Sequence, residues 1–451
     1  MRLRALVALL GFAFATPAPG TEWFRSGDTS FEFTGSLREL MILTRGTDAD
    51  RFAETAAAAG TACLLVASFP DCPAWDVVGE KDLWTSLTRL RLEFEAHAMQ
   101  TLSAVVHYDH ELRTGILDTF ESELATGFDT RRFVDLEGEI VDRADAEWEH
   151  SLYRAYLRYD DKKLEVTLGR QRVPWGVGRL WNPIDRFNAI GPLAIEADQS
   201  GGVDALRVRY LLRNLTSIEG VVAGGARRED VAAALRFSGV YRDVDYGFIG
   251  GIFEEAPTFG LDLASNLGDA AGRVEAVWTD PTRRVRPFGR LEKDDLRAYW
   301  QVVVSADYVV DVGPGVYLLA EYLYNGAALG FGKGDAAGRV AFFQESGQTG
   351  VGLGRLVAPG TSDLLGHTRV VSLSRHLVGG QMGWDVTPEL RADVLLIVDA
   401  ERGATSWFPS LRYSPTGWLE LTLAAQLFTG KRRSEYGTAE PLGFALVEVF
   451  F

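Results

Sequence analysis

Long apolar runs are absent from this 451-residue chain beyond its first twenty residues. The mean hydropathy is −0.01, which argues against a bundle of membrane-spanning helices, because each such helix needs about 20 consecutive apolar residues. Basic residues are also scarce, since 46 lysines and arginines stand against 62 acidic residues and give a net charge of −16. Phosphate recognition requires a basic surface, so no nucleic-acid partner is expected.

Cysteine, methionine and histidine are rare, with 2, 4 and 6 copies. Cys63 and Cys72 are close in sequence, and export to an oxidising compartment favours a disulfide between them. No histidine lies near them to complete a tetrahedral zinc site, and His107 and His110 are three apart on a predicted strand and face opposite sides. Motifs of the G-x-S-x-G, H-E-x-x-H and P-loop types are missing. We therefore expect no metal, no cofactor and no enzymatic activity.

The first twenty residues have the three parts of a secretory signal peptide. A basic start at Arg2 and Arg4 precedes an apolar run over 5–14, and Ala13 and Ala15 form a small-x-small pattern. The sequence predicts a signal peptide over 1–20, cleaved near Ala15 or Ala18. Residues 21–451 are then expected to form a single domain, since no linker divides them.

Polar and apolar residues alternate through the rest of the chain. Leu90, Leu92, Phe94 and Ala96 alternate with charged residues between 89 and 97, which is the two-residue period of a β-strand. Short turn sequences, such as 160–163 and 414–417, alternate with long connections. This pattern predicts an all-β, antiparallel transmembrane barrel with short periplasmic turns and long extracellular loops. The predicted count is about eighteen strands, with sixteen as the alternative, over 29–43, 83–97, 101–110, 151–159, 164–172, 203–212, 215–223, 232–241, 245–253, 259–267, 272–279, 297–309, 316–324, 376–386, 390–399, 405–413, 418–428 and 441–451.

Alternation alone also fits a soluble sandwich with its apolar face turned inward. Aromatic residues near strand ends, such as Tyr153, Tyr159, Trp407 and Trp418, favour a membrane barrel because aromatic girdles lie at the membrane interfaces. No repeat of the length of a propeller blade is present.

The last strand, over 443–451, has apolar residues at alternate positions and ends in Phe451. In this it resembles the bacterial outer-membrane barrels, and the segment 164–183 is similar to poorly characterised porins of the alginate-export type. The resemblance implies an outer-membrane location, contact with lipid and lipopolysaccharide, and recognition of Phe451 by the barrel-assembly machinery. The acidic net charge differs from a polyanion exporter, whose pore should be basic. Only the barrel is therefore carried over, and not the substrate.

Charged residues on the polar strand faces are predicted to line the lumen. Arginine keeps its charge when it is partly desolvated, so an arginine-bearing wall suits the passage of carboxylates or phosphates. The alternative is that these residues pair across the lumen and stiffen the wall. The predicted lumen residues are Arg89, Arg91, Glu93, Glu95, Arg154, Arg158, Arg207 and Arg209.

The third long loop, 173–202, is rich in proline, aromatic and charged residues. We predict that it folds into the barrel and forms a constriction; an external surface loop is the alternative. Its expected constriction residues are Arg179, Asp185, Arg186, Glu196 and Asp198.

A second long loop, 111–150, holds 12 acidic and 4 basic residues. It is expected to be a solvated surface loop, with divalent-cation bridging to lipopolysaccharide as the alternative.

Together these features predict a porin-like channel for passive diffusion of small polar or anionic solutes. Two alternatives remain: a structural sheath around a periplasmic partner such as a multihaem cytochrome, and an outer-membrane hydrolase. A homotrimer is one expected assembly.

Overall fold

A computed structural model describes residues 21–46, 81–115, 132–143, 146–188, 191–195, 202–213, 215–225, 231–253, 256–281, 298–328, 372, 374–431, 434–436 and 441–451. The predicted signal peptide and the Cys63–Cys72 pair lie outside these residues. Within the described part of the chain, no helix is long and apolar enough to cross a membrane.

Twenty β-strands form one sheet, in which neighbours in the wall run antiparallel. They are β1 (Thr21–Ser26), β2 (Thr29–Gly46), β3 (Lys81–Ala98), β4 (Leu102–Gly115), β5 (Glu137–Arg143), β6 (Ala146–Asp160), β7 (Leu164–Gln171), β8 (Val203–Arg213), β9 (Thr216–Ala223), β10 (Ala232–Tyr241), β11 (Val244–Phe253), β12 (Ala256–Leu267), β13 (Ala270–Thr279), β14 (Tyr299–Val310), β15 (Val316–Asn325), β16 (His376–Thr387), β17 (Leu390–Asp399), β18 (Thr405–Thr416), β19 (Leu419–Thr429) and β20 (Leu442–Phe450).

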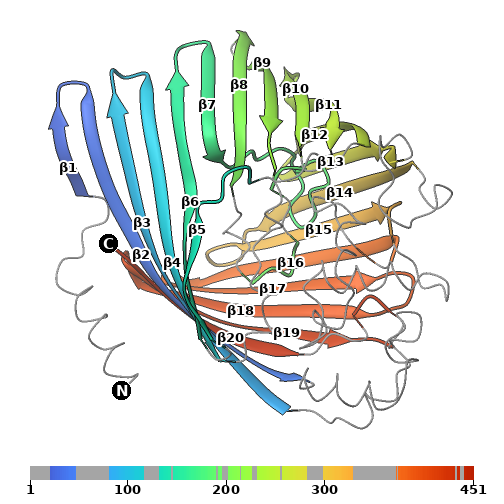
Figure 1. Ribbon diagram of the computed structural model, residues 1–451. Helices are drawn as coiled ribbons and strands as arrows, with labels where there is room; N and C mark the ends of the chain where they lie inside the picture. Colours follow the sequence, from blue (N-terminus) through green and yellow to red (C-terminus); the bar gives the residue numbers. More distant parts are fainter. Residues whose placement is uncertain are drawn as a thin grey trace, which may run out of the picture.

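Eighteen of these strands close into a barrel (Figure 1). Each wall strand pairs with the next, β4 pairs with β6, and β20 returns to pair with β2 in a register that sets Leu37 opposite Val449. Closure leaves no free sheet edge in the wall, so every wall strand has hydrogen-bonding neighbours on both sides. The predicted all-β barrel of eighteen strands is confirmed.

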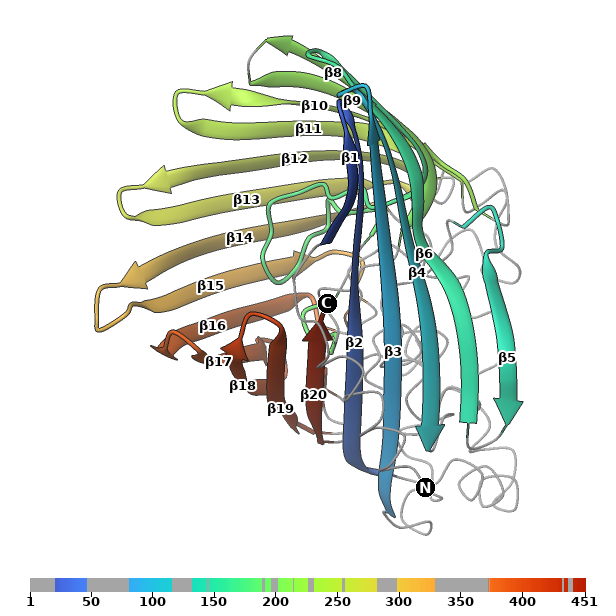
Figure 2. The ribbon, with the colours of Figure 1, turned by 90° about the vertical axis from the view of Figure 1, so that its left-hand side faces the viewer.

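Two strands outside the wall, β1 and β5, were not predicted. β1 folds back on the start of β2, and β5 pairs with the 146–151 half of β6 (Figure 2). The other half of β6 pairs with β7, because β7 leaves the wall after Gln171. β5 therefore occupies the position beside β6 that β7 has vacated.

Tight turns join the wall strands at one end of the barrel. Arg242–Asp243 have positive φ angles and form a two-residue hairpin turn between the paired residues Tyr241 and Val244. Met99 and Gln100 also have positive φ angles, in the three-residue connection 99–101. The predicted turn regions near 311–315 and 414–417 also join neighbouring strands at this end. We call it the short-turn end.

The outer face of the wall is apolar. Leu235, Phe248, Trp300 and Leu423 are among many large apolar side chains that are exposed on it. Their neighbours in sequence, such as Arg236 and Ile249, point inward and are shielded from solvent. An apolar outer band around a polar interior is the arrangement of a barrel that lies in lipid.

The loop inside the barrel and the cavity beside it

The described residues of the segment 172–195, which are 172–188 and 191–195, lie in the interior of the barrel instead of beyond its rim (Figures 1 and 2). Trp175, Trp181, Ile184 and Phe187 are all buried, and they pack on inward-facing residues of the wall. The apolar core of this protein is therefore the contact between the segment and the wall. We call 172–195 the inner loop.

Glu275 of β13 is the first anchor of the inner loop. Its carboxylate accepts hydrogen bonds from the backbone N–H groups of Val177, Gly178 and Ile184; the Gly178 bond measures 2.6 Å and the Ile184 bond 3.3 Å. The three donors belong to two separate stretches of the loop, so one side chain fixes both stretches.

Glu321 of β15 is the second anchor. It accepts hydrogen bonds from the backbone N–H groups of Arg179, Leu180 and Trp181, at 2.9, 3.0 and 2.7 Å. Successive N–H groups that converge on one carboxylate form an anion-binding concavity. In this protein the carboxylate is a side chain of the barrel wall, and the loop supplies the N–H groups that surround it.

Further contacts fix the path of the inner loop. The indole N–H of Trp175 donates to Glu219 at 2.6 Å, and the Gln426 side-chain amide donates to the carbonyl of Leu193 at 2.7 Å. These contacts tie the loop to β9 on one side and to β19 on the other. The loop therefore spans the lumen.

Two glycines are required for this path. Gly176 has a φ of +91°, and a Cβ there would lie 2.0 Å from the side-chain oxygen of Asn182. Gly379 of β16 faces the loop, and a Cβ there would lie 2.3 Å from Leu180 Cδ1. The backbone of the wall thus lies directly against the loop at Gly379.

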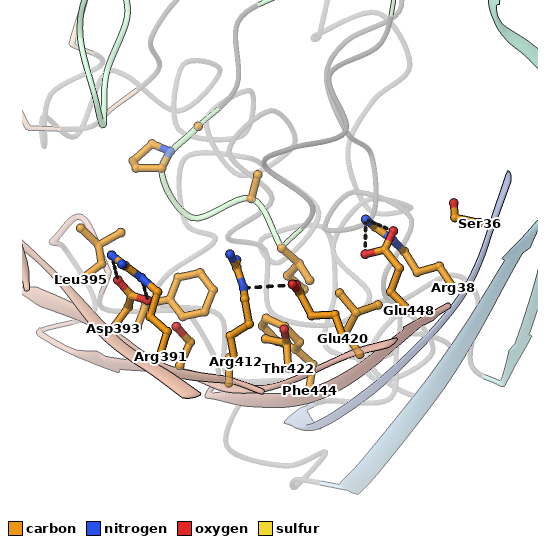
Figure 3. Close-up of a pocket in the computed structure, with 18 of the residues that line it drawn as sticks. Ser36, Arg38, Arg391, Asp393, Leu395, Arg412, Glu420, Thr422, Phe444 and Glu448 are labelled. Atoms are coloured by element: carbon orange, nitrogen blue, oxygen red, sulfur yellow. Dashed lines mark hydrogen bonds and ion pairs between the residues drawn. The ribbon is translucent and has the colours of Figure 1, made fainter. Parts of the chain in front are cut away.

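A cavity of about 1320 Å³ lies between the inner loop and the wall. Six arginines and five carboxylates line it, from the loop and from β2, β3 and β16–β20. Most of these charges are paired along the wall (Figure 3). The pairs are Arg38–Glu448 at 2.8 Å, Arg391–Asp393 at 2.8 Å and Arg412–Glu420 at 3.2 Å.

Arg172 and Arg179 differ from the wall arginines. Both are exposed to the cavity, and neither guanidinium forms an ion pair within the described residues. A second cavity of about 400 Å³ near Pro314 and Gly315 is also lined by Arg179. Arg179 therefore lies between the main cavity and the short-turn end of the barrel.

The predicted lumen residues face inward, and several are in ion pairs. Arg89 contacts Glu111 at 2.6 Å, Arg91 contacts Asp109 at 2.6 Å, and Arg207 contacts Glu219 at 3.0 Å. These three arginines pair with carboxylates on the neighbouring strand, and not across the lumen as the alternative had it. Of the remaining residues, Glu93 and Glu95 lie beside His107 and His97, Arg154 lies over the Tyr153 ring, Arg158 lies 3.9 Å from Glu165, and Arg209 has no ion-pair partner among the described residues.

The predicted constriction residues have different environments. Arg179 lines the cavity, and so does Asp185, although Asp185 is only 5% exposed and accepts a hydrogen bond from the Asn188 N–H at 2.8 Å. Arg186 is 1% exposed, donates to Thr279 at 2.5 Å and does not line the cavity. Glu196 and Asp198 lie outside the described residues.

The expectation that 111–150 is one surface loop is wrong at both of its ends. β4 continues to Gly115 and β6 begins at Ala146, so Glu111 and Glu147 lie in strands and pair with Arg89 and Arg113. Glu111, Glu147 and Glu149 therefore occupy inward positions of long strands. Arg38, Arg391 and Arg412 were not among the predicted lumen residues, although Arg391 and Arg412 alternate with outward apolar residues.

Searches against known proteins gave matches only among solved structures. No protein-family model matches the chain, and no curated protein matches it in sequence. OccAB1 from Acinetobacter baumannii is similar with a TM-score of 0.51 and 8% identity, covering 97% of this chain and 99% of that chain. A double variant of OccD1 (OprD) has a TM-score of 0.51 and 10% identity, covering 95% and 97%. OccAB4 from Acinetobacter baumannii has a TM-score of 0.50 and 9% identity, covering 93% and 98%. The chain therefore has the fold of the outer-membrane porins of the Occ and OprD type.

Proposed function

We propose that the protein is an outer-membrane channel for passive diffusion of small polar or anionic solutes. The observation that carries the proposal is the cavity of about 1320 Å³ between the inner loop and the wall. A cavity of this size inside a barrel with an apolar outer band offers a polar path through a membrane. Short turns face the periplasm in such barrels, so the cavity lies on the path from the outside to the short-turn end.

A preference for anions is supported by the charges along this path. The carboxylates on the wall of the cavity are largely neutralised by arginines, whereas Arg172 and Arg179 are not neutralised by any described carboxylate. Unpaired guanidinium groups in a narrow space attract carboxylate and phosphate groups. We therefore assign the constriction to Arg179, and Asp185 lines the same cavity.

Liposome swelling tests the channel directly. Proteoliposomes that contain the full chain should swell with small organic acids and small sugars, and they should swell faster with an acid than with a neutral solute of the same size. Impermeability to every solute would refute the channel, and equal rates for acids and neutral solutes would refute the anion preference.

The alternatives are less well supported. A sheath would need an interior wide enough for another protein, but the inner loop is bonded to wall strands on both sides of the lumen. The solved structures that share the fold, such as OccD1 (OprD) and OccAB1, are outer-membrane porins and not hydrolases. Recognition of Phe451 by the assembly machinery, and contact with lipopolysaccharide, remain proposals from the sequence.

A further inference from the structure

A carboxylate lies on the outer face of the barrel wall in the middle of a strand. In β2, Arg38, Leu40 and Ile42 point inward and are buried, whereas Met41 is 52% and Leu43 63% exposed. Glu39 alternates with the inward residues and therefore faces outward, in the middle of the strand.

No other carboxylate of the described wall strands is in this position. Asp204 also faces outward, but it lies at the start of β8, where it bonds Arg170 and the backbone N–H groups of 133 and 134. Glu39 instead accepts hydrogen bonds from the hydroxyls of Ser86 and Thr88 on the outer face of β3, the latter at 2.5 Å. A carboxylate on a lipid-facing surface is costly, so its presence indicates a partner in the membrane.

Two histidines lie on the same outer face, one strand beyond β3. His110 of β4 and His150 of β6 are opposite each other in register, with ring centroids 6.0 Å apart. Their neighbours Leu112 and Trp148 are exposed on the outer face. Within the described residues, neither imidazole has a hydrogen-bond partner, and the Nδ1 atom of each is unsatisfied. We call Glu39, Ser86, Thr88, His110 and His150 the outer polar patch.

Glu39 and His110 lie at the same height in the membrane. Glu39 is paired with Thr88 of β3, and Thr88 is paired with Leu112 of β4. Leu112 is two residues farther from the short-turn end than His110. A line of paired residues rises along the barrel axis from β2 to β4. One such line begins at Gly35 of β2, which bonds Phe451 at the end of β20 and so lies near the short-turn end. The same line reaches β4 at Tyr108, which is far above the turn at Met99. With strands about 4.8 Å apart and tilted by about 40°, two strand spacings raise the level by roughly 6 Å, and the return to His110 lowers it by roughly 5 Å.

We propose that the outer polar patch is the interface with a second copy of this chain. A two-fold axis along the membrane normal that passes through β3 exchanges the positions of β2 and β4 at constant height. It therefore brings Glu39 of each copy opposite His110 of the other copy, which gives two equivalent contacts. Ser86 and Thr88 lie at the axis, and their small side chains allow the two walls to approach closely. The proposal requires that the barrel lie in a membrane, but not that it conduct.

Native mass spectrometry of the full-length protein in lipid nanodiscs tests this assembly. We expect a dimer for the natural sequence. Glu39→Leu and His110→Leu should each weaken the dimer on the order of tenfold, because each removes one side of both contacts. Leucine is well suited to a lipid-facing position, so neither change should prevent folding. The swap of Glu39→His with His110→Glu should restore the dimer relative to either single change of the swap.

A steric pair gives the matched control. Thr88→Trp places a large side chain at the axis and should abolish the dimer. Leu235→Trp, on the outer face of β10 and 63% exposed, should leave it unchanged. The proposal is overturned by a monomer or a trimer of the natural sequence, by a dimer that withstands the Leu substitutions, or by a monomer that retains lipopolysaccharide only when Glu39 is present.

Discussion

Replacement of Glu321 by alanine should open the inner loop. The substitution removes the acceptor of three backbone N–H groups, those of Arg179, Leu180 and Trp181. Each hydrogen bond to a charged acceptor contributes about 1.5–3 kcal/mol, so the closed position of the loop loses roughly 4–9 kcal/mol at most. Water that enters the gap will offset part of this loss. Even a net loss of about 3 kcal/mol changes the ratio of closed to open loop roughly 100-fold.

Single-channel recording in planar bilayers measures the result. We expect a larger conductance for Glu321→Ala than for the natural protein, and a smaller increase for Glu321→Gln, which keeps one acceptor oxygen. Asp307→Asn is the matched control, because Asp307 also faces inward but pairs with Arg273 and not with the loop. Limited proteolysis within 172–195 should rise in parallel. Unchanged conductance and unchanged cleavage in Glu321→Ala would show that the apolar contacts alone hold the loop, and would refute this reasoning.

Three further outcomes are expected. Arg179→Gln should move the reversal potential in a KCl gradient toward that of a cation-preferring pore, while Arg179→Lys keeps the natural value; equal potentials for all three proteins would remove Arg179 from the constriction. Gly379→Leu should displace Leu180 and increase conductance as Glu321→Ala does, because no side chain fits between the wall and the loop; a natural conductance in a folded barrel would contradict this. Deletion of Phe451 should lower the amount of folded, heat-modifiable barrel in the outer membrane severalfold, and a natural yield would show that the terminal aromatic is not needed for assembly.

Much of the wall could be predicted because alternation has a direct physical cause. A residue such as Leu235 faces lipid and its neighbour Arg236 faces the lumen, so the alternation of apolar and polar residues identifies each strand from its own sequence. β5 was missed because its alternating charges, Glu137, Glu139 and Asp142, are typical of a solvated loop. Its pairing with β6 is possible because β7 ends early, at Gln171, and the sequence of β5 itself does not predict where β7 ends.

The site was only partly predictable, for a related reason. Prolines and aromatic residues in 173–202 predicted a loop that folds inward, and its described residues 173–188 and 191–195 lie inside the barrel. Glu275 and Glu321 could not be identified as anchors, because their partners are backbone N–H groups, which every residue except proline has. Charged loop residues such as Arg186 were assigned to the pore on composition alone, whereas burial against Thr279 is a property of the folded contact.

The anchors of the inner loop have a consequence for how such a channel can change. Because Glu275 and Glu321 bind the main chain of the loop, the cavity-lining side chains of Arg172 and Arg179 do not contribute to holding the loop in place. The residues at Arg172 and Arg179 can therefore be exchanged without opening the loop, provided that Asn182, which bonds Trp175 and Asp185 within the loop, and the wall carboxylates are retained. The barrel wall and its two carboxylates fix the position of the loop backbone, whereas the side chains that the loop presents to the cavity can change by substitution.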